Sequence, residues 1–296
     1  MTSQTMRRRF AATSNDLLDT DPRLALTLAD IGVGSFNGRN HPDRIINVGI
    51  REQLLIGATA GLALAGLRPI AHTYAPFLIE RPFEQIKLDL SHQDLGAVLV
   101  SIGGSFDAAA EGRTHQAPGD VALMATLPDW TIHVPGHPDE VEAMLRRAAT
   151  SDDRVYMRLA ADTNTSPHPV TGELAKIRTG TARGATAVAV GPMLDRVLAA
   201  TEHLDINVLY AATVRPFDAA TLREIAQAPE VILVEPYLEG TSAAEVSHAL
   251  EDRPHRLLSI GVPNTEHRRY GTRRHHAAAH GLDVGGLRTR IEEFLR

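Results

Sequence analysis

The stretch Asn47-Val-Gly-Ile-Arg-Glu-Gln53 places a single acid, Glu52, at the start of a long apolar run. After Gln53 no charged residue follows until Arg68. This composition predicts a helix that is buried on several sides, with these apolar residues: Leu54, Leu55, Ile56, Ala58, Ala60, Leu62, Ala63, Leu64 and Ala65. The helix dipole favours an acid in the first turn. Glu52 is therefore either an ordinary first-turn acid or a functional carboxyl held where water is scarce.

The composition is typical of a globular, mildly acidic protein. The chain has 296 residues, of which 43% are hydrophobic and 22% charged, and its net charge is -6. This length accommodates two domains with separate cores. The negative net charge does not favour the binding of polyanions, so we expect no nucleic-acid partner. The absence of cysteine excludes disulfides and thiol catalysis.

Two observations bear on the location of the protein. The segment Met1–Arg9 is polar and basic and lacks the apolar core of a secretory signal. The longest uncharged run, Leu54–Leu67, is rich in Ala, Gly and Thr and is shorter than the ~20 apolar residues that span a bilayer. We therefore expect a soluble, cytoplasmic protein without a membrane partner, and we interpret Arg7, Arg8 and Arg9 as a solvated basic start.

Apolar runs alternate with helical patterns along the chain, which predicts two α/β domains with mostly parallel sheets. In the first half we expect helices at 6–20, 52–65, 80–89 and 138–150, and strands at 24–30, 44–48, 68–74, 95–102, 130–134 and 154–156. In the second half we expect strands at 185–190, 206–210, 231–234 and 256–260, with helices at 193–204, 218–226 and 242–249. A polar segment with two prolines sets the boundary. The predicted domains are 1–165 and 181–296, joined by a linker at 166–180.

Three segments of the first domain together resemble enzymes of the transketolase superfamily, which use thiamine diphosphate. The segment around Glu52 is similar to their glutamate motif, in which the acid contacts the aminopyrimidine ring of the cofactor. Tyr74-Ala-Pro-Phe-Leu78 resembles Tyr-Ser-Thr-Phe-Leu of deoxyxylulose phosphate synthase, and this implies that Phe77 stacks on that ring. Arg81 is a further implied cofactor contact, although one extra residue separates it from its counterpart.

Asp30 follows the buried strand 24–30 and is also a candidate cofactor contact. Open α/β sheets place ligands at the carboxyl ends of parallel strands. Asp is equally a common turn residue. The two interpretations of Asp30 remain open.

The third segment, Glu111-Gly-Arg-Thr-His-Gln116, resembles Asp-Gly-Pro-Thr-His-Gln of transketolases. The match implies that His115 is a catalytic, substrate-binding residue, and an imidazole that titrates near neutral pH suits proton transfer. Glu111 stands where the family has an acid that contacts a sugar hydroxyl. The loop differs from the His motif of the 2-oxo acid dehydrogenase beta chains.

The phosphate-binding residues of the family are only partly matched. A transketolase His and a synthase Arg that bind sugar phosphate fall near Gly103 or Gly104 in this chain. Arg158 matches another family arginine that contacts the phosphate, so it is the predicted anion contact. Arg7, Arg8 and Arg9 include a candidate counterpart of a third such arginine, but the register is not clear, and we leave them as a solvated basic start. Whether the substrate is phosphorylated stays open.

The second domain is also similar to the C-terminal domain of the synthase. Val214-Arg-Pro-Phe-Asp218 and Glu235-Pro-Tyr-Leu-Glu-Gly240 resemble segments of that domain. The family has a short helix at the His-rich and Arg-rich stretch 267–280. That stretch lacks the acids and the defined spacing of a metal site, so we predict no metal there.

One family motif is absent from the sequence. No Gly-Asp-Gly followed by Asn at the family spacing occurs, and that motif holds the diphosphate through Mg2+. The resemblance therefore implies the C-terminal, pyrimidine-binding subunit of a split transketolase, which transfers a two-carbon ketol unit from a ketose or ketose phosphate to an aldehyde. A separate N-terminal subunit would hold the diphosphate and Mg2+, with two copies of each chain. The alternatives are a subunit similar to deoxyxylulose phosphate synthase or to 2-oxo acid decarboxylating enzymes, and a non-catalytic scaffold.

Overall fold

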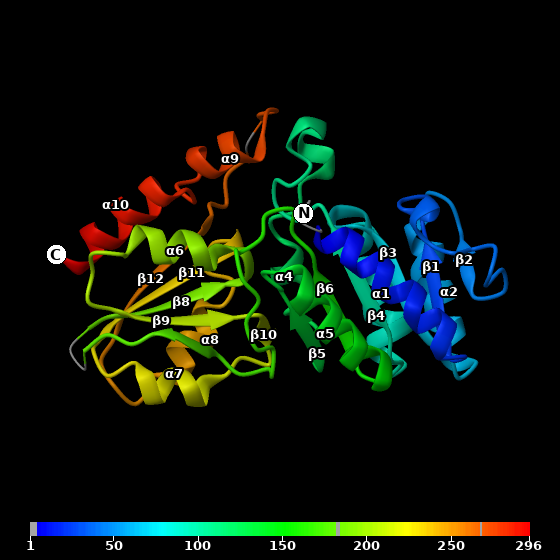
Figure 1. Cartoon of the computed structure of the whole chain (residues 1–296), viewed down its shortest axis with the longest axis horizontal. Coiled ribbons are helices and arrows are strands. Elements are labelled where there is room, and N and C mark those ends of the chain that lie inside the picture. The colour runs from blue at the N-terminus through cyan, green and yellow to red at the C-terminus, as the bar shows by residue number, and fades with distance from the viewer. Residues whose placement is uncertain (1–4, 182–183, 267) are drawn as a thin grey trace.

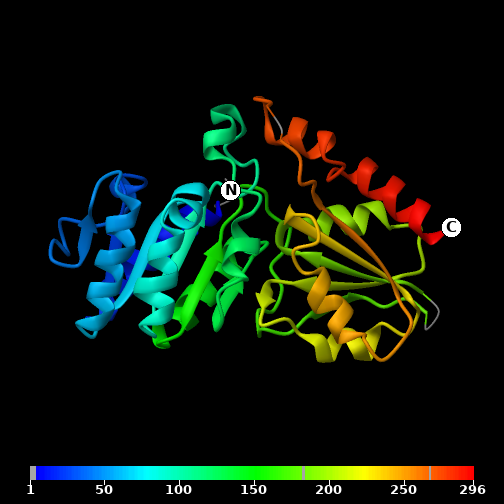
Figure 2. The same cartoon turned by 180° about the vertical axis from the view of Figure 1, so that it is seen from behind.

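The computed structural model describes residues 5–181, 184–266 and 268–296. Two α/β domains lie side by side, and in each of them helices cover both faces of a sheet (Figures 1 and 2). The prediction of two domains with mostly parallel sheets is confirmed. Among the described residues, no helix combines the length and the apolar character that crossing a membrane requires.

The first sheet has seven strands in the order β10-β5-β6-β4-β3-β1-β2. They are β1 (Leu24–Leu28), β2 (Ile45–Asn47), β3 (Arg68–Tyr74), β4 (Val98–Ile102), β5 (Trp130–His133), β6 (Arg154–Arg158) and β10 (Thr213–Arg215). All neighbours pair in parallel except β10, which runs antiparallel to β5. Since β10 follows four elements of the second domain in sequence, it ties the two domains together.

Each face of the first sheet carries its own helices. Helices α1 (Met6–Thr20) and α5 (Pro138–Thr150) cover one face, and α2 (Glu52–Leu64), α4 (Asp120–Met124) and the helical segment 76–92 cover the other. The strand register aligns Leu26, Ile70, Val98 and Val155 in one row under α1 and α5. The segment 76–92 contains wide helical turns and α3 (Phe83–Gln85), and it extends the predicted helix 80–89 at both ends.

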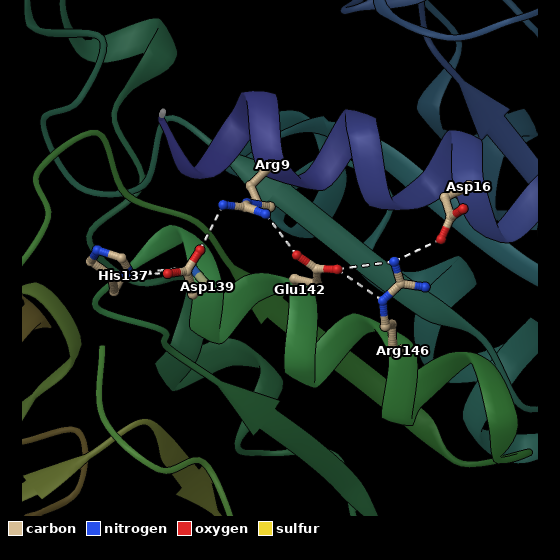
Figure 3. Close-up of polar contacts among 6 residues, drawn as sticks. All are labelled: Arg9, Asp16, His137, Asp139, Glu142 and Arg146. Atoms are coloured by element: carbon tan, nitrogen blue, oxygen red, sulfur yellow. Dashed lines mark hydrogen bonds and ion pairs between the residues drawn. The ribbon is translucent and has the colours of Figure 1, made fainter. Parts of the chain in front are cut away.

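Helices α1 and α5 lie side by side and are joined by a chain of ion pairs (Figure 3). Arg9 contacts Asp139 at 2.6 Å and Glu142 at 2.7 Å, and Arg146 contacts Glu142 and Asp16 at 2.9 and 2.6 Å. Because these side chains are partly exposed, each pair contributes at most about 1 kcal/mol. The interpretation of Arg9 as a solvated basic residue is wrong, because its guanidinium is held between two acids.

The predicted burial of α2 on several sides is also wrong. Leu55, Ile56 and Ala60 are buried against the sheet, but Leu54 is 53% exposed and Leu64 is 65% exposed. The helix therefore buries one face only. Its second apolar face is in contact with solvent in the isolated chain.

The second sheet has the order β12-β11-β8-β9-β7, in which only β7 is antiparallel to its neighbour. Its strands are β7 (Ala175–Arg178), β8 (Thr186–Val190), β9 (Asn207–Ala211), β11 (Glu230–Leu238) and β12 (Arg256–Val262). Helices α6 (Leu194–Ala200) and α10 (Val284–Leu295) cover one face, and α7 (Ala219–Ile225) and α8 (Ala243–Ala249) cover the other. Strand β7 lies within the predicted linker.

A short helix, α9 (Arg273–Ala279), stands beside the first domain at the seam (Figure 1). The family helix expected in this stretch is present. Phe106, from the loop after β4, stacks on His276 of this helix and on His280 directly after it, with ring centroids 4.6 and 4.3 Å apart. The loop after β4 is thereby packed against the second domain.

Candidate functional site

The predicted site residues gather at the carboxyl edge of the first sheet. Tyr74 ends β3, Arg158 ends β6 and Gly103 follows β4. Helix α2 begins at the same edge, since it follows the short strand β2, and Glu52 is its first residue. This is the edge at which open α/β sheets bind ligands.

Three of the four predicted cofactor residues are linked through Arg81, which contacts both Glu52 and Phe77. The side chain of Glu52 is 2% exposed, and its Oε2 accepts a hydrogen bond of 2.5 Å from Nη1 of Arg81. The guanidinium carbon of Arg81 lies 4.3 Å from the centroid of the Phe77 ring. The site thus combines a buried carboxyl with an aromatic ring and a planar cation. Such a set fits a flat heterocycle, because the ring offers a stacking surface and the carboxyl a hydrogen-bonding partner.

His115 joins this group through its ring contacts. Its imidazole lies 5.0 Å from the Phe77 ring and 5.7 Å from the Tyr74 ring, and both contacts are edge-on. The Nδ1 atom is 2.9 Å from the hydroxyl of Thr114. Tyr74 is not among the residues predicted for the site, although it opens the motif that contains Phe77. Glu111, on the same loop, is exposed to solvent.

Asp30 occupies a tight turn. Its φ of 61° lies in the left-handed region, which Asp tolerates better than most residues. Its backbone N–H and one carboxylate oxygen are bonded to the side chain of Asn47, both at 2.9 Å. These contacts account for Asp30 as a turn residue, and its role in cofactor binding stays a prediction.

Arg158 is held in a buried network. Its Nε donates to Asp120 at 2.7 Å and its Nη2 to Ser105 at 2.7 Å, and the side chain is 1% exposed. The hydroxyl of Tyr156 donates to the same Asp120 oxygen. Burial, reinforced by Asp120, raises the pKa of Tyr156 well above its usual range, so this hydroxyl remains a donor. The predicted contact between Arg158 and an anionic substrate stays a prediction.

The two glycines at the expected phosphate anchor have a packing role. A Cβ atom on Gly103 would lie 2.2 Å from Cδ1 of Tyr74, and one on Gly104 would lie 2.5 Å from Cζ of Arg158. Any side chain at these positions would therefore displace Tyr74 or Arg158. The chain has small residues here because a ring and a guanidinium occupy the space.

Within the described ranges, no cluster of three His, Asp or Glu residues is placed to hold a metal ion. His267, in the His-rich stretch, lies outside those ranges. His276 and His280 belong to the stack with Phe106 instead.

Comparison with protein families gives two matches that together cover most of the chain. The model of the transketolase pyrimidine binding domain matches residues 2–163. The model of the transketolase C-terminal domain matches residues 175–286.

Two curated relatives illustrate the range of similarity. An uncharacterized 33.6 kDa protein in the fasciation locus of Rhodococcoides fascians is 50% identical, and the match covers 97% of this chain and 93% of the relative. The 1-deoxy-D-xylulose-5-phosphate synthase of Thioalkalivibrio sulfidiphilus is 30% identical over 92% of this chain. The chain spans less than half of that synthase, since the match covers 44% of its length.

Two solved structures have the same fold. A split gene transketolase, described as an inactive beta4 tetramer, superposes with a TM-score of 0.86 at 25% identity, over 98% of both chains. The transketolase of Campylobacter jejuni superposes with a TM-score of 0.77 at 17% identity. That match covers 96% of this chain and 46% of the enzyme.

Proposed function

Because this chain belongs to the transketolase family, we propose that it is the pyrimidine-binding half of a two-component transketolase that depends on thiamine diphosphate. The observation that carries the proposal is the contact group of Glu52, Arg81, Phe77 and His115 at the carboxyl edge of the first sheet. The assembled enzyme transfers a two-carbon ketol unit from a ketose or its phosphate to an aldehyde.

The residues present fit the pyrimidine end of the cofactor. Phe77 offers a ring face for stacking, Glu52 exchanges a proton with a ring nitrogen, and Arg81 donates a hydrogen bond to this buried carboxyl. Asp30 is a further proposed contact. When it is bound, thiamine diphosphate supplies the electron sink that ketol transfer needs. The chain itself orients the ring and excludes water around Glu52.

The substrate is proposed to lie between the cofactor group and the loop after β4. His115 is the catalytic residue that moves a proton at a substrate oxygen, and Glu111 contacts a hydroxyl. Arg158, which ends β6 beneath this loop, adds positive charge and is the proposed contact for the anionic end of the substrate.

The diphosphate and Mg2+ are proposed to be held by a second, N-terminal chain. Two observations support a partner on the α2 side of the molecule. The sequence lacks the family's diphosphate motif. Apolar side chains are also exposed along α2 and the adjoining segments: Ile50, Leu54, Leu64 and Leu88. We propose an assembly with two copies of each chain, because in this superfamily the site lies between subunits.

Purification with the chain encoded beside it tests the proposal. We expect weak binding of thiamine diphosphate by the isolated chain, and tight, Mg2+-dependent binding and ketol transfer by the mixture. Calorimetry measures the binding, and light scattering measures the stoichiometry. Tight, Mg2+-dependent binding by the pure chain contradicts the two-component arrangement. A stable complex with one copy of each chain contradicts the proposed stoichiometry. Release of CO2 from pyruvate without use of ketoses supports the decarboxylating alternative, and inactivity of a stable complex supports the scaffold.

A further inference from the structure

We propose that a cavity between the two domains binds a free amino acid with an apolar side chain. The cavity has a volume of about 290 Å³. It lies between the loop after β4 and the ends of β11 and β12, and its polar lining includes Arg113, Gln116 and Glu266. The residues that the proposed function assigns to cofactor or substrate do not line it. The cavity is therefore a second site, distinct from the candidate site at the edge of the first sheet.

The two charged residues in the described lining have opposite signs. Nε of Arg113, on the loop, lies 3.4 Å from Oε1 of Glu266, on the segment after β12, and both side chains are more than half exposed. A long, exposed ion pair contributes little to stability, so a ligand can separate the two groups at small cost. The cation and the acid leave the lining without net charge, which suits a zwitterion better than an anion. The guanidinium would bind the carboxylate of an amino acid, and Glu266 would accept from its ammonium group.

Gln116 supplies a further donor on the cavity wall. The residue is 1% exposed, and its Nε2 is buried without a hydrogen-bond partner among the described residues. A buried amide N–H that lacks an acceptor is costly, and a ligand carboxylate would provide that acceptor. The backbone carbonyl of Gln116 also accepts from Nη1 of Arg113 at 2.9 Å, which holds the guanidinium beside this residue. Arg113 and Gln116 thus form the carboxylate-binding end of the site.

The rest of the site offers an apolar wall for the side chain of the ligand. Both domains contribute to it, with these residues: Phe106, Pro118, Leu238, Val262 and Pro263. The wall is formed in the absence of a ligand, because Phe106 is stacked on His276 and His280. The backbone N–H of Leu238 also donates to the carbonyl of Pro118 at 2.7 Å, which joins the two domains at this point. Apolar walls with a few polar groups are typical of sites for small molecules.

The position of the cavity gives the bound amino acid a regulatory role. Arg113 and Gln116 flank His115, so a ligand held by both residues restrains the segment that carries the proposed catalytic histidine. This role rests on the proposed function. The binding itself can be measured on the full chain without cofactor or partner.

Titration with leucine by calorimetry tests the site, because leucine combines a zwitterion with an apolar side chain. We expect saturable binding by the wild type, with a Kd on the order of 1 mM or below. Leucinamide lacks the carboxylate and N-acetylleucine lacks the ammonium group, so each should bind at least about tenfold more weakly. Glycine should also bind at least about tenfold more weakly, because it buries no apolar side chain.

Variants of the polar residues test their roles. Arg113→Gln, Glu266→Gln and Gln116→Met should each weaken leucine binding by about tenfold, because each removes a hydrogen bond to a charged group of the ligand. A thermal melt shows whether each variant is folded. Arg113 and Glu266 are exposed, so their variants carry the test even if the buried Gln116→Met unfolds.

Two exposed residues that do not line the cavity provide matched controls, Arg269→Gln and Glu293→Gln, and both should bind leucine as the wild type does. No saturable binding of leucine by the wild type overturns the proposal, and so do equal losses in the controls and the cavity variants. Binding of leucinamide or N-acetylleucine as tight as that of leucine overturns the assignment of a zwitterion. Absence of transferase activity in the assembled protein leaves the binding result standing.

Discussion

The carboxylate of Glu52 and the guanidinium of Arg81 form an ion pair of 2.5 Å in which the acid is buried and the arginine is 38% exposed. This pair ties the first turn of α2 to the helical segment that follows β3. A buried carboxyl group without a hydrogen-bond partner is costly, and Arg81 supplies that partner to Glu52. The pair also places the acid beside Phe77, because Arg81 lies over that ring.

Replacement of Glu52 should reduce the activity of the assembled enzyme much more than its affinity for the cofactor. In the assembled enzyme we expect Glu52→Gln to remove most activity while thiamine diphosphate affinity changes by less than about tenfold, or about 1.4 kcal/mol. The amide keeps the shape of the site but cannot exchange the proton. Hydrogen–deuterium exchange at the thiazolium C2 position measures this step. Glu84→Gln, an exposed acid on the adjoining segment, is the control. An unchanged exchange rate in Glu52→Gln would exclude Glu52 from catalysis.

Most of the fold could be predicted because local patterns determine it. The helix 138–150 and the strand 68–74 agree with α5 and β3 to the residue. The helix has apolar residues at helical spacing, and the strand is bounded by the charged Arg68 and by Pro76. Strand β10 was not predicted because its three residues are too few to show a hydrophobic period. The strand forms by antiparallel pairing with β5, which lies about 80 positions earlier in the sequence. Only tertiary contacts determine such a strand.

The site could be predicted only in part. Family motifs identified the residues that gather around Phe77, because they lie in short segments with recognisable spacing. The pairing of Arg158 with Asp120 could not be predicted from the sequence. The two residues are 38 positions apart, and no sequence motif contains both of them.

A buried acid in the second domain should make stability depend on pH. Glu235 is fully buried, and burial raises its pKa to about 7 from an ordinary value of 4.5. The folded state therefore holds the proton more tightly than the unfolded state, and stability is lost as the pH rises from about 4.5 through 7. Glu235→Gln should remove this loss. We expect the free energy of unfolding of the variant relative to wild type to increase by about 2 to 3 kcal/mol between pH 5 and pH 8.

Urea denaturation of both proteins at the two pH values measures this difference. Other buried groups also titrate, including His72 and His133, whose pKa values burial lowers to about 4. They contribute equally to both proteins, so the difference isolates Glu235. A variant whose stability follows the wild type across this range would mean that Glu235 stays ionised in the folded state without cost.

The buried pair of Arg158 and Asp120 should be important for stability. Arg158→Ala leaves the carboxylate of Asp120 buried and without its cation, and we expect a loss of about 3 to 5 kcal/mol. Arg154, on the same strand, pairs with Asp94, which is 90% exposed. Arg154→Ala should therefore lower stability by less than about 1 kcal/mol. Denaturant titration compares the two variants, and equal losses would mean that the buried pair has no special role.

The exposed apolar face of α2 should be needed for assembly with the second chain. Leu54 lies two residues after Glu52 and is 53% exposed, so Leu54→Lys should leave the fold and its stability nearly unchanged. An interface that covers this residue must instead bury a charge, and we expect the affinity for the partner to fall by at least about tenfold. Ala220→Lys, an exposed position on α7 of the second domain, adds the same charge elsewhere as a control. Light scattering of mixed chains and a thermal melt of each variant measure assembly and folding separately. Full assembly of Leu54→Lys with its partner would place the interface on another face and remove the main structural support for a subunit seated against α2.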